Sequence, residues 1–191
     1  MTPDIVTRLH EDNNMVVYNP EFLTEQNALE DFVNPPMHVF GGDKTHCHYL
    51  YQFYLDHSRC KDTTTRSYYL TPAEASFVKY GINSFLASKV LWFNQFSDLC
   101  EKHNVKYNAV MNSMITDQRI GNSHITVPGP DGRKGYGGAC FPKDTNAFSR
   151  FAEGDFSLLD LVIKENNKYR SEYKLDDREK EQNVVYIRNK I

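Results

Sequence analysis

Residues 71–102 read TPAEASFVKYGINSFLASKVLWFNQFSDLCEK. The stretch opens with Thr71, Pro72 and Glu74 in the order of a capping box, with proline at the first helical position. No further proline follows, and Gly81 is the only glycine. Apolar residues recur at helical spacing throughout. The stretch therefore predicts one helix of roughly 45 Å at 1.5 Å per residue, long enough to form a spine or a subunit interface.

The residues before this helix favour a small α/β layer. Apolar runs at 15–18 and 37–40 predict two buried strands, and the tyrosine-rich run 66–70 predicts a third. Between them, 43–56 predicts a helix with an aromatic inner face. Together these pieces suggest part of an α/β sheet and not a whole one.

Helical patterns continue after the long helix. They cover 107–115, a segment that starts near Pro142, and 157–169. A loop rich in glycine and proline separates the first two, and charge dominates from Lys174 onward. The fold class expected is an α/β fragment with an all-α central domain.

Bulk composition narrows the class of protein. Hydrophobic residues make up 40% of the 191 residues and charged residues 25%, which is typical of soluble globular proteins. A net charge of -3 gives no field that attracts nucleic acid. No apolar run reaches the roughly 20 residues of a membrane span, and the N-terminus has no signal-peptide pattern. We expect a cytoplasmic protein without membrane or nucleic-acid partners.

Residues 135–144 read GYGGACFPKD and carry the strongest chemical signal. Glycines let the backbone close around a ligand and leave amide groups free for an oxyanion. Cys140 lies just before a predicted helix, and Lys143 is three residues away, a setting typical of a nucleophilic cysteine that attacks an aldehyde carbon. Asp144, one turn beyond, can orient a proton transfer or a water. The alternative is a structural cysteine after a flexible turn.

This string resembles the G-[FY]-G-G-x-C-F-P-K-D motif of the UDP-glucose/GDP-mannose dehydrogenase family. Four further segments agree with that family in order. They are NPEFLTE at 19–25, KYGINSFLA at 79–87, DQRIG at 117–121 and VPGPDG at 127–132. The agreement covers about residues 15 to 150.

The resemblance implies NAD-dependent oxidation of the C6 alcohol of a nucleotide sugar in two steps. Cys140 would hold the aldehyde as a thiohemiacetal and then as a thioester. Lys79 would stabilise the oxyanion at C6, Asn83 would hold the sugar or the same oxygen, and Glu21 would serve the acid–base and hydrolysis steps. The i, i+4 spacing of Lys79 and Asn83 places them on one helix face. The alternative for Lys79 is a solvated surface amine.

The resemblance also implies binding residues in the same motifs. Those for the substrate are Phe22, Leu23, Thr24, Glu25, Lys79, Asn83, Arg119, Tyr136 and Gly137. Arg119 would reach a substrate in the neighbouring subunit, and Asp144 would assist Cys140 and the water. Lys143 and Glu21 would contact NAD. The pair Glu21 and Glu25 is equally compatible with an ordinary first helix turn.

The sequence departs from the family in having no G-x-G-x-x-G string. Residues 1–70 are therefore predicted to be a remnant of the dinucleotide-binding domain. Residues 71–173 are predicted to form the helical central domain, used for dimerisation and substrate binding, and 174–191 a charged tail. We expect a homodimer through the long helix, and an NAD domain from a separate polypeptide or an upstream segment.

Several alternatives stay open. Residues 35–37 echo the GDP-mannose branch of the family, whereas the N-S-F-L-A helix and the R-I-G turn favour UDP-glucose, which we prefer. The chain could be a catalytic part, a non-catalytic nucleotide-sugar-binding or dimerisation module, or a truncated gene product. The histidines and cysteine at 46–48 and 57 fit no common zinc spacing, and no metal is expected.

Overall fold

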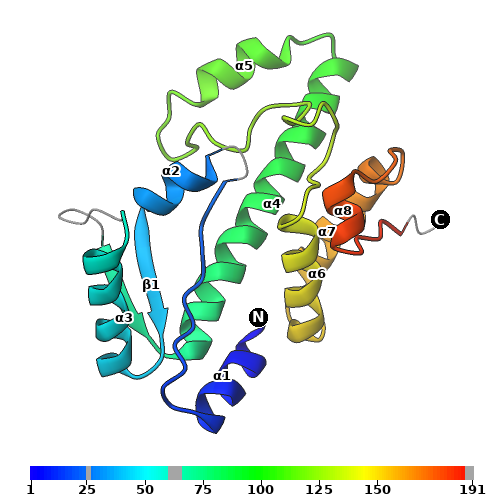
Figure 1. The fold of residues 1–191 in the computed structure, drawn as a ribbon. Coiled ribbons are helices and arrows are strands. Elements are labelled where there is room, and N and C mark those ends of the chain that lie inside the picture. Colours follow the sequence, from blue (N-terminus) through cyan, green and yellow to red (C-terminus); the bar gives the residue numbers. More distant parts are fainter. Residues whose placement is uncertain (25–26, 60–65, 188–191) are drawn as a thin grey trace. The chain divides into compact units, whose positions relative to one another are not determined.

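The computed structural model describes residues 1–24, 27–59 and 66–187 (Figure 1). It divides into two compact units, Met1–Gly81 and Ile82–Ile191, which are treated separately below. The described residues are mostly helical, with one small parallel sheet. This confirms the fold class expected, an α/β fragment with a helical domain.

The first unit is built on two strands and the helix between them. Its elements are α1 (Pro3–Asp12), α2 (Ala28–Val33), β1 (Met37–Gly41), α3 (Lys44–His57), β2 (Arg66–Leu70) and the first turns of α4 (Pro72–Lys102). The strands are parallel, with Met37 opposite Arg66 and Gly41 opposite Leu70. Parallel neighbours need a crossover, which α3 provides. The strands predicted at 37–40 and 66–70 and the helix predicted at 43–56 are confirmed.

The strand predicted at 15–18 is wrong. Only Tyr18 pairs, in an isolated antiparallel bridge to Gly41, with N–H···O distances of 2.8 and 2.7 Å. The preceding residues form a turn in which the Val16 amide donates to the Asn13 carbonyl at 3.0 Å, and Met15 is 67% exposed. Four apolar residues are too short a run to define a strand period.

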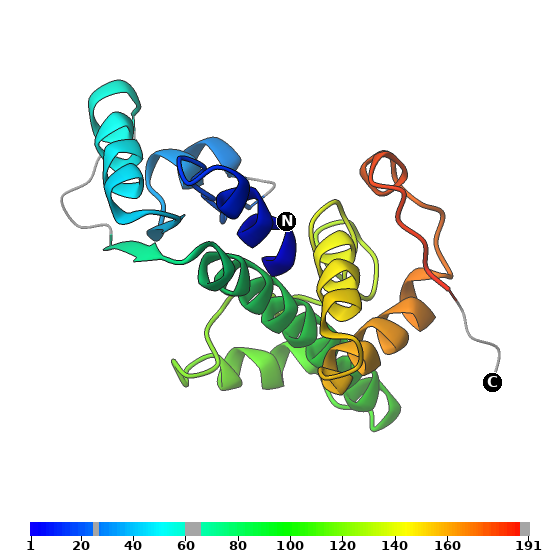
Figure 2. The same ribbon diagram turned by 90° about the horizontal axis from the view of Figure 1, so that it is seen from below.

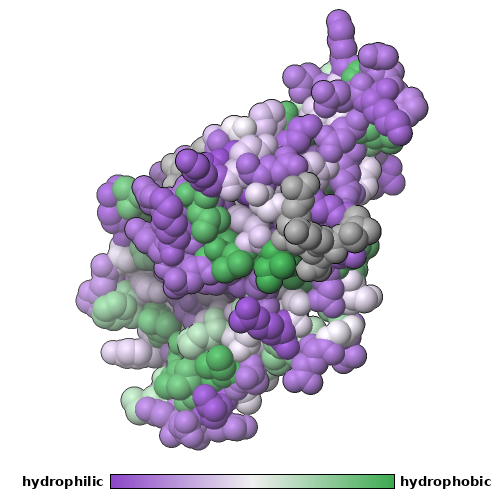
Figure 3. Space-filling view, turned by 90° about the vertical axis from the view of Figure 1, so that its right-hand side faces the viewer, coloured by the Kyte–Doolittle hydropathy of each residue, from purple (hydrophilic) through white to green (hydrophobic). Residues whose placement is uncertain are grey.

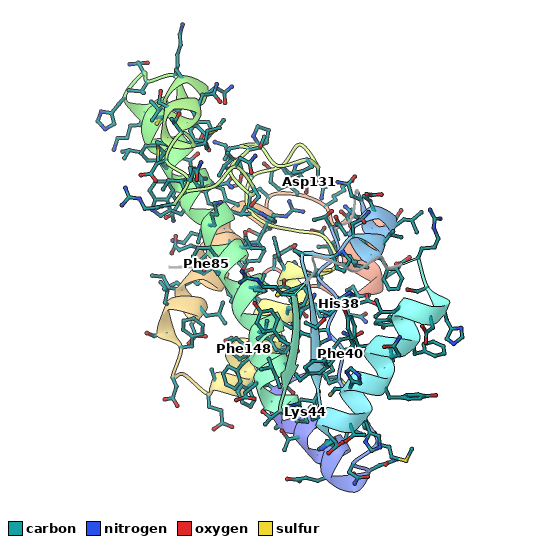
Figure 4. All side chains as sticks on the ribbon, turned by 90° about the vertical axis from the view of Figure 1, so that its left-hand side faces the viewer. His38, Phe40, Lys44, Phe85, Asp131 and Phe148 are labelled. Atoms are coloured by element: carbon teal, nitrogen blue, oxygen red, sulfur yellow. The ribbon has the colours of Figure 1, made fainter. Side chains whose placement is uncertain are left out.

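Aromatic rings fill the space between β1 and α3. His38 and Phe40 on β1 lie 5.6 and 5.9 Å from the Tyr51 ring, and about as close to Tyr54. Figure 4 shows both labelled side chains on the α3 side of the strand. The aromatic inner face predicted for this helix is therefore present.

The long helix α4 has the bounds that its capping box predicts. The Thr71 hydroxyl accepts from the Glu74 amide at 3.3 Å, and the Glu74 carboxylate accepts from the Thr71 amide at 2.8 Å. Two orphan amides of the first turn are thus paired reciprocally. The helix runs without a break from Pro72 to Lys102.

The second unit contains the rest of α4 and four shorter helices. These are α5 (Tyr107–Met114), α6 (Phe141–Ala152), α7 (Ser157–Arg170) and α8 (Asp177–Glu181). Helices α6 and α7 pack against each other (Figure 2). The predicted helices at 107–115, near 142 and at 157–169 are confirmed.

A small apolar core joins these helices to the glycine-rich string. Its buried members are Ala87, Leu91, Tyr136 and Val162, and Val90, Phe141 and Tyr169 pack around them. Tyr136 thus brings the string into the core. Apolar patches also interrupt the mostly hydrophilic face drawn in Figure 3. Within the described ranges, no helix combines the length and apolar character that crossing a membrane requires.

Gly41 should be intolerant of a side chain. A Cβ there would lie 2.6 Å from the Ala75 Cβ and 3.0 Å from the Pro72 Cα, both on a rigid helix. We expect Gly41→Ala to lower the free energy of unfolding by about 1–3 kcal/mol through overpacking, measured by urea denaturation. Gly81→Ala is the control, since nothing lies within 4 Å of its Cβ. It should stabilise α4 by about 0.5–1 kcal/mol. Equal effects of the two changes would contradict the packing argument.

Candidate active site

Cys140 lies at the N-terminus of helix α6. It is the N-cap residue of α6, its side chain is exposed, and its thiol is free. The buried Pro142 pre-sets the first turn, and the Asp144 amide donates to the Cys140 carbonyl at 2.9 Å. By contrast, Cys47 and Cys100 are buried. The geometry is that of a reachable thiol at a helix N-terminus, where partial positive charge favours anions.

Asp144 is the buried centre of a polar group behind this thiol. Its carboxylate is 3% exposed, and one oxygen accepts from the Asn83 Nδ2 at 2.6 Å. The other oxygen accepts from the Lys143 ammonium, whose side chain is half exposed. Asn83 is itself buried on α4. The structure therefore brings together three residues that the sequence singled out, Asn83, Lys143 and Asp144. Of these, Asp144 lies one helical turn beyond Cys140.

In the first unit, Lys79 meets the N-P-E-F segment. Its ammonium donates to the Glu21 carbonyl oxygen at 2.5 Å and lies 5.6 Å from the Phe22 ring centroid. Lys79 is half-buried, whereas the Glu21 side chain is exposed. The Lys79 amine thus has a backbone partner and an aromatic neighbour within this unit. Its role at C6 stays a prediction.

Asn19 fixes the start of the same segment. Its side-chain amide donates to the Val39 carbonyl at 2.8 Å and accepts from the Tyr54 hydroxyl at 2.8 Å. The segment is thereby tied to β1 and α3 before it turns outward. Phe22 and Leu23 line a cavity of about 40 Å³ in this unit, which is large enough for a water molecule.

Thr24 has a local partner that the sequence did not indicate. Its hydroxyl and amide both donate to one oxygen of Asp31, at 2.5 and 2.7 Å. The Thr24 hydroxyl, followed by its amide, lowers the pKa of the exposed Asp31 carboxyl. Glu25, the next predicted substrate residue, lies outside the described residues.

Arg119 projects from the R-I-G turn. Its side chain is 90% exposed and forms an ion pair with Asp117 at 2.5 Å, which raises the pKa of Arg119 and lowers the pKa of Asp117. The turn is held by Lys89, whose ammonium donates to the Ile120 carbonyl at 2.9 Å. Among the described residues Arg119 is thus largely exposed, and its predicted contact with a neighbouring subunit's substrate is untested.

Two amides at the start of the glycine-rich string are paired with side chains and are not free for a ligand. The Gly135 amide donates to the Asn94 side chain at 3.0 Å, and the Tyr136 amide donates to the Asn166 side chain at 2.7 Å. The Tyr136 side chain lies in the core, and burial raises its pKa to about 12. Its predicted contact with the nucleotide or sugar stays untested, as does that of Gly137.

The sequence reasoning missed the buried polar residues around this string. Asn94, Asn166, Arg170 and Glu179 are each only 1% exposed. For two of them, the sequence contains a signal that the residue is buried. Asn94 lies seven residues after the core residue Ala87, and Asn166 lies four residues after Val162, so helical periodicity places both on an inward face.

No metal site accompanies the thiol. Over residues 1–24, 27–59 and 66–187, no three His, Cys, Asp or Glu side chains are grouped so that they could hold a metal ion.

Comparison with known proteins places the chain in a family. Residues 73–168 match the model of the UDP-glucose/GDP-mannose dehydrogenase family, central domain. A UDP-glucose 6-dehydrogenase of Bacillus subtilis is 36% identical over 156 residues, which are 80% of this chain and 33% of that protein. The corresponding enzyme of Rhizobium meliloti is 36% identical over 173 residues, or 84% of this chain and 37% of its own.

A solved structure also matches. The UDP-glucose dehydrogenase of Pyrobaculum islandicum superposes with a TM-score of 0.69 and 32% identity, over 80% of this chain and 34% of that one. The chain thus spans about a third of the length of the relatives it matches. It belongs to the UDP-glucose/GDP-mannose dehydrogenase family.

His124, whose ring lies beside Phe141, should make the free energy of unfolding depend on pH. Its ring lies 5.6 Å from that of Phe141, and its buried Nδ1 has no partner among the described residues. Burial, followed by the charge of Lys89, lowers the pKa of His124. A depressed pKa means that the unfolded chain binds the proton first. Stability is therefore present above pH 6.5 and lost as pH falls through the folded pKa.

We expect the free energy of unfolding to fall more between pH 7.5 and pH 5.5 for the wild type than for His124→Asn. Asparagine tolerates the left-handed backbone of this position, where φ is 61°. The other histidines are common to both proteins and cancel in the difference. Parallel pH curves would show that His124 is not the titrating group.

Proposed function

We propose that this chain supplies the nucleophile and the nucleotide-sugar site of a UDP-glucose 6-dehydrogenase. The observation that carries the proposal is the exposed Cys140 thiol at the N-terminus of α6, next to the buried Asn83–Asp144 hydrogen bond. A nucleophile placed beside a group that can orient a water is what a two-step oxidation through a covalent thioester requires. The family and the UDP-glucose 6-dehydrogenases it resembles support the choice of reaction.

The residues of the candidate site then have the following roles in the reaction. The Cys140 sulfur attacks the C6 aldehyde carbon, and the resulting oxyanion is stabilised by Lys79 and Asn83, which lie four residues apart on α4. After oxidation to the thioester, Asp144 orients the water that attacks the same carbon, with Glu21 assisting the proton transfer. Asp144 is suited to this because its position is fixed by two hydrogen-bond donors.

The described residues do not by themselves form a dinucleotide site. The sequence has no G-x-G-x-x-G string, and the described sheet has two strands. We therefore assign NAD binding mainly to a nucleotide-binding domain on another polypeptide or on a further segment. From this chain, the proposal assigns only Lys143 and Glu21 to contacts with NAD.

A second candidate function is a non-catalytic nucleotide-sugar-binding or dimerisation module. The missing dinucleotide motif favours it. The two candidates differ in whether Cys140 turns over, because a binding module needs the sugar contacts but not the thiol.

The first experiment measures NADH absorbance with the purified chain, UDP-glucose and NAD, alone and with an added NAD-binding polypeptide of a relative. We expect turnover in at least one of these mixtures, and at least a 10³-fold loss in Cys140→Ser, because the covalent route is removed. GDP-mannose in place of UDP-glucose tests the sugar nucleotide. Turnover that persists in Cys140→Ser would contradict the mechanism.

Calorimetric titration with UDP-glucose separates the two candidates when no mixture turns over. Binding by both the wild type and Cys140→Ser would favour the binding module. If neither protein bound UDP-glucose, the nucleotide-sugar site would be contradicted in both candidates, and only the dimerisation module would remain.

We also propose that two copies associate through α4. Phe85, Trp92 and Leu99 are 68, 50 and 52% exposed, and their seven-residue spacing aligns them in one stripe. A second copy of the same stripe would cover this apolar surface in a self-complementary contact.

Light scattering after gel filtration tests this pairing. We expect about twice the 22.2 kDa of one chain, and a monomer for Trp92→Glu, since a charge in the stripe loses its solvation on association. Tyr49→Glu is the control, because Tyr49 is a 75% exposed aromatic residue on α3 and not on α4. A monomeric wild type, or dissociation by both changes alike, would contradict the assignment.

A further inference from the structure

Asn166 on α7 binds both the backbone N–H and the backbone C=O of one residue of the glycine-rich string, Tyr136. Its Oδ1 accepts from the Tyr136 amide at 2.7 Å, and its Nδ2 donates to the Tyr136 carbonyl at 3.0 Å. The side chain is 1% exposed, so both bonds are made away from water. A carboxamide suits this pairing because it offers an acceptor oxygen and a donor nitrogen on one short side chain.

Asn94 on α4 holds the preceding residue. Its Oδ1 accepts from the Gly135 amide at 3.0 Å, while its Nδ2 donates to the Val90 carbonyl of its own helix at 2.8 Å. Gly135 has a φ of 78°, a left-handed conformation that glycine adopts without strain. The backbone at 135–136 is therefore pinned to two helices by side chains that cannot exchange these bonds with solvent.

Arg170 closes the other side of this segment. A Cβ on Gly137 would lie 2.1 Å from the Arg170 Nη2, so the guanidinium rests directly on the glycine. The guanidinium is 1% exposed and donates to Asp131 at 2.7 Å and to Glu179 at 2.6 Å. Its orientation is thus fixed by two carboxylates, one from the loop and one from α8.

We propose that Asn166 is a positioning residue for Cys140, supported by Asn94 and Arg170. The inference rests on the proposed function, in which Cys140 is the nucleophile. Asn166 binds Tyr136, and only residues 137–139 separate Tyr136 from Cys140. At the other end of this segment, the Cys140 carbonyl accepts from the Asp144 amide. Holding both ends of so short a segment fixes where the exposed thiol stands relative to a bound sugar.

Asn166→Leu removes both hydrogen bonds while keeping a side chain of similar size. We expect hydrogen exchange of the Tyr136 amide to become about tenfold faster or more, since a buried donor and acceptor lose their partner. In the mixture that oxidises UDP-glucose, kcat should fall about tenfold or more while KM for UDP-glucose stays within about twofold. A merely structural role would lower apparent kcat through a smaller active fraction, but it would speed amide exchange throughout the unit. Loss of positioning speeds exchange at Tyr136 selectively.

Asn167→Leu is the matched control. It makes the same chemical change one residue along α7, where the side chain faces a different direction, and should leave both readouts unchanged. Where Asn166→Leu does not fold, Asn94→Leu takes its place and Gly135 amide exchange is measured, with the same expected changes.

The outcomes separate this inference from the proposed function. A Tyr136 amide that exchanges as slowly in Asn166→Leu as in the wild type overturns the inference. So does an equal loss of kcat in Asn166→Leu and Asn167→Leu. A wild-type chain that never oxidises UDP-glucose contradicts the proposed function instead, while amide exchange still decides whether Asn166 holds the segment.

Discussion

The buried hydrogen bond between Asn83 and Asp144 is the interaction on which the candidate site depends. A carboxylate that is 3% exposed needs partners for its oxygens, because an unpaired buried charge is costly. Asn83 supplies one at 2.6 Å, and Lys143 supplies the other. The bond joins the long helix α4 to the first turn of α6, where the thiol stands. Within the second unit, the position of α4 therefore also determines the surroundings of Cys140.

The glycine-rich string is shaped as much by packing as by any ligand. Gly137 has no room for a side chain because Arg170 occupies that space. A Cβ on Gly135 would lie 2.7 Å from the Asn166 Oδ1. Buried Arg170 would be destabilising alone, and its two carboxylate partners offset this. Burial alone would raise the pKa of Glu179, yet hydrogen bonds from the Asp176 amide, Tyr186 and Arg170 together lower it. The residues after Lys174 are thus part of this packing.

How far the sequence could predict the structure depends on whether the information was local. The bounds of α4 follow from a capping box and an unbroken helical period, and β1 and β2 from runs closed by turn residues. The run at 15–18 failed because four apolar residues fit several conformations. For the site, motif resemblance identified Asn83 and Asp144, and the structure adds that they touch. Counting charge described 174–191 as a tail, but could not reveal that Glu179 is buried against Arg170, a contact between separate helices.

The same distinction explains how this local geometry can form in a chain that spans about a third of the length of the relatives it matches. Lys79 is held by the carbonyl of Glu21 within the first unit, and Asn83 by Asp144 within the second. Each contact is made by neighbours inside its own unit and does not require a dinucleotide fold. The helix α4 carries both residues one turn apart, so their spacing along it is set by backbone geometry alone. Under the proposed function, oxidation is the step that depends most on an NAD-binding domain, because the residues proposed for covalent capture and hydrolysis make their contacts within the described residues.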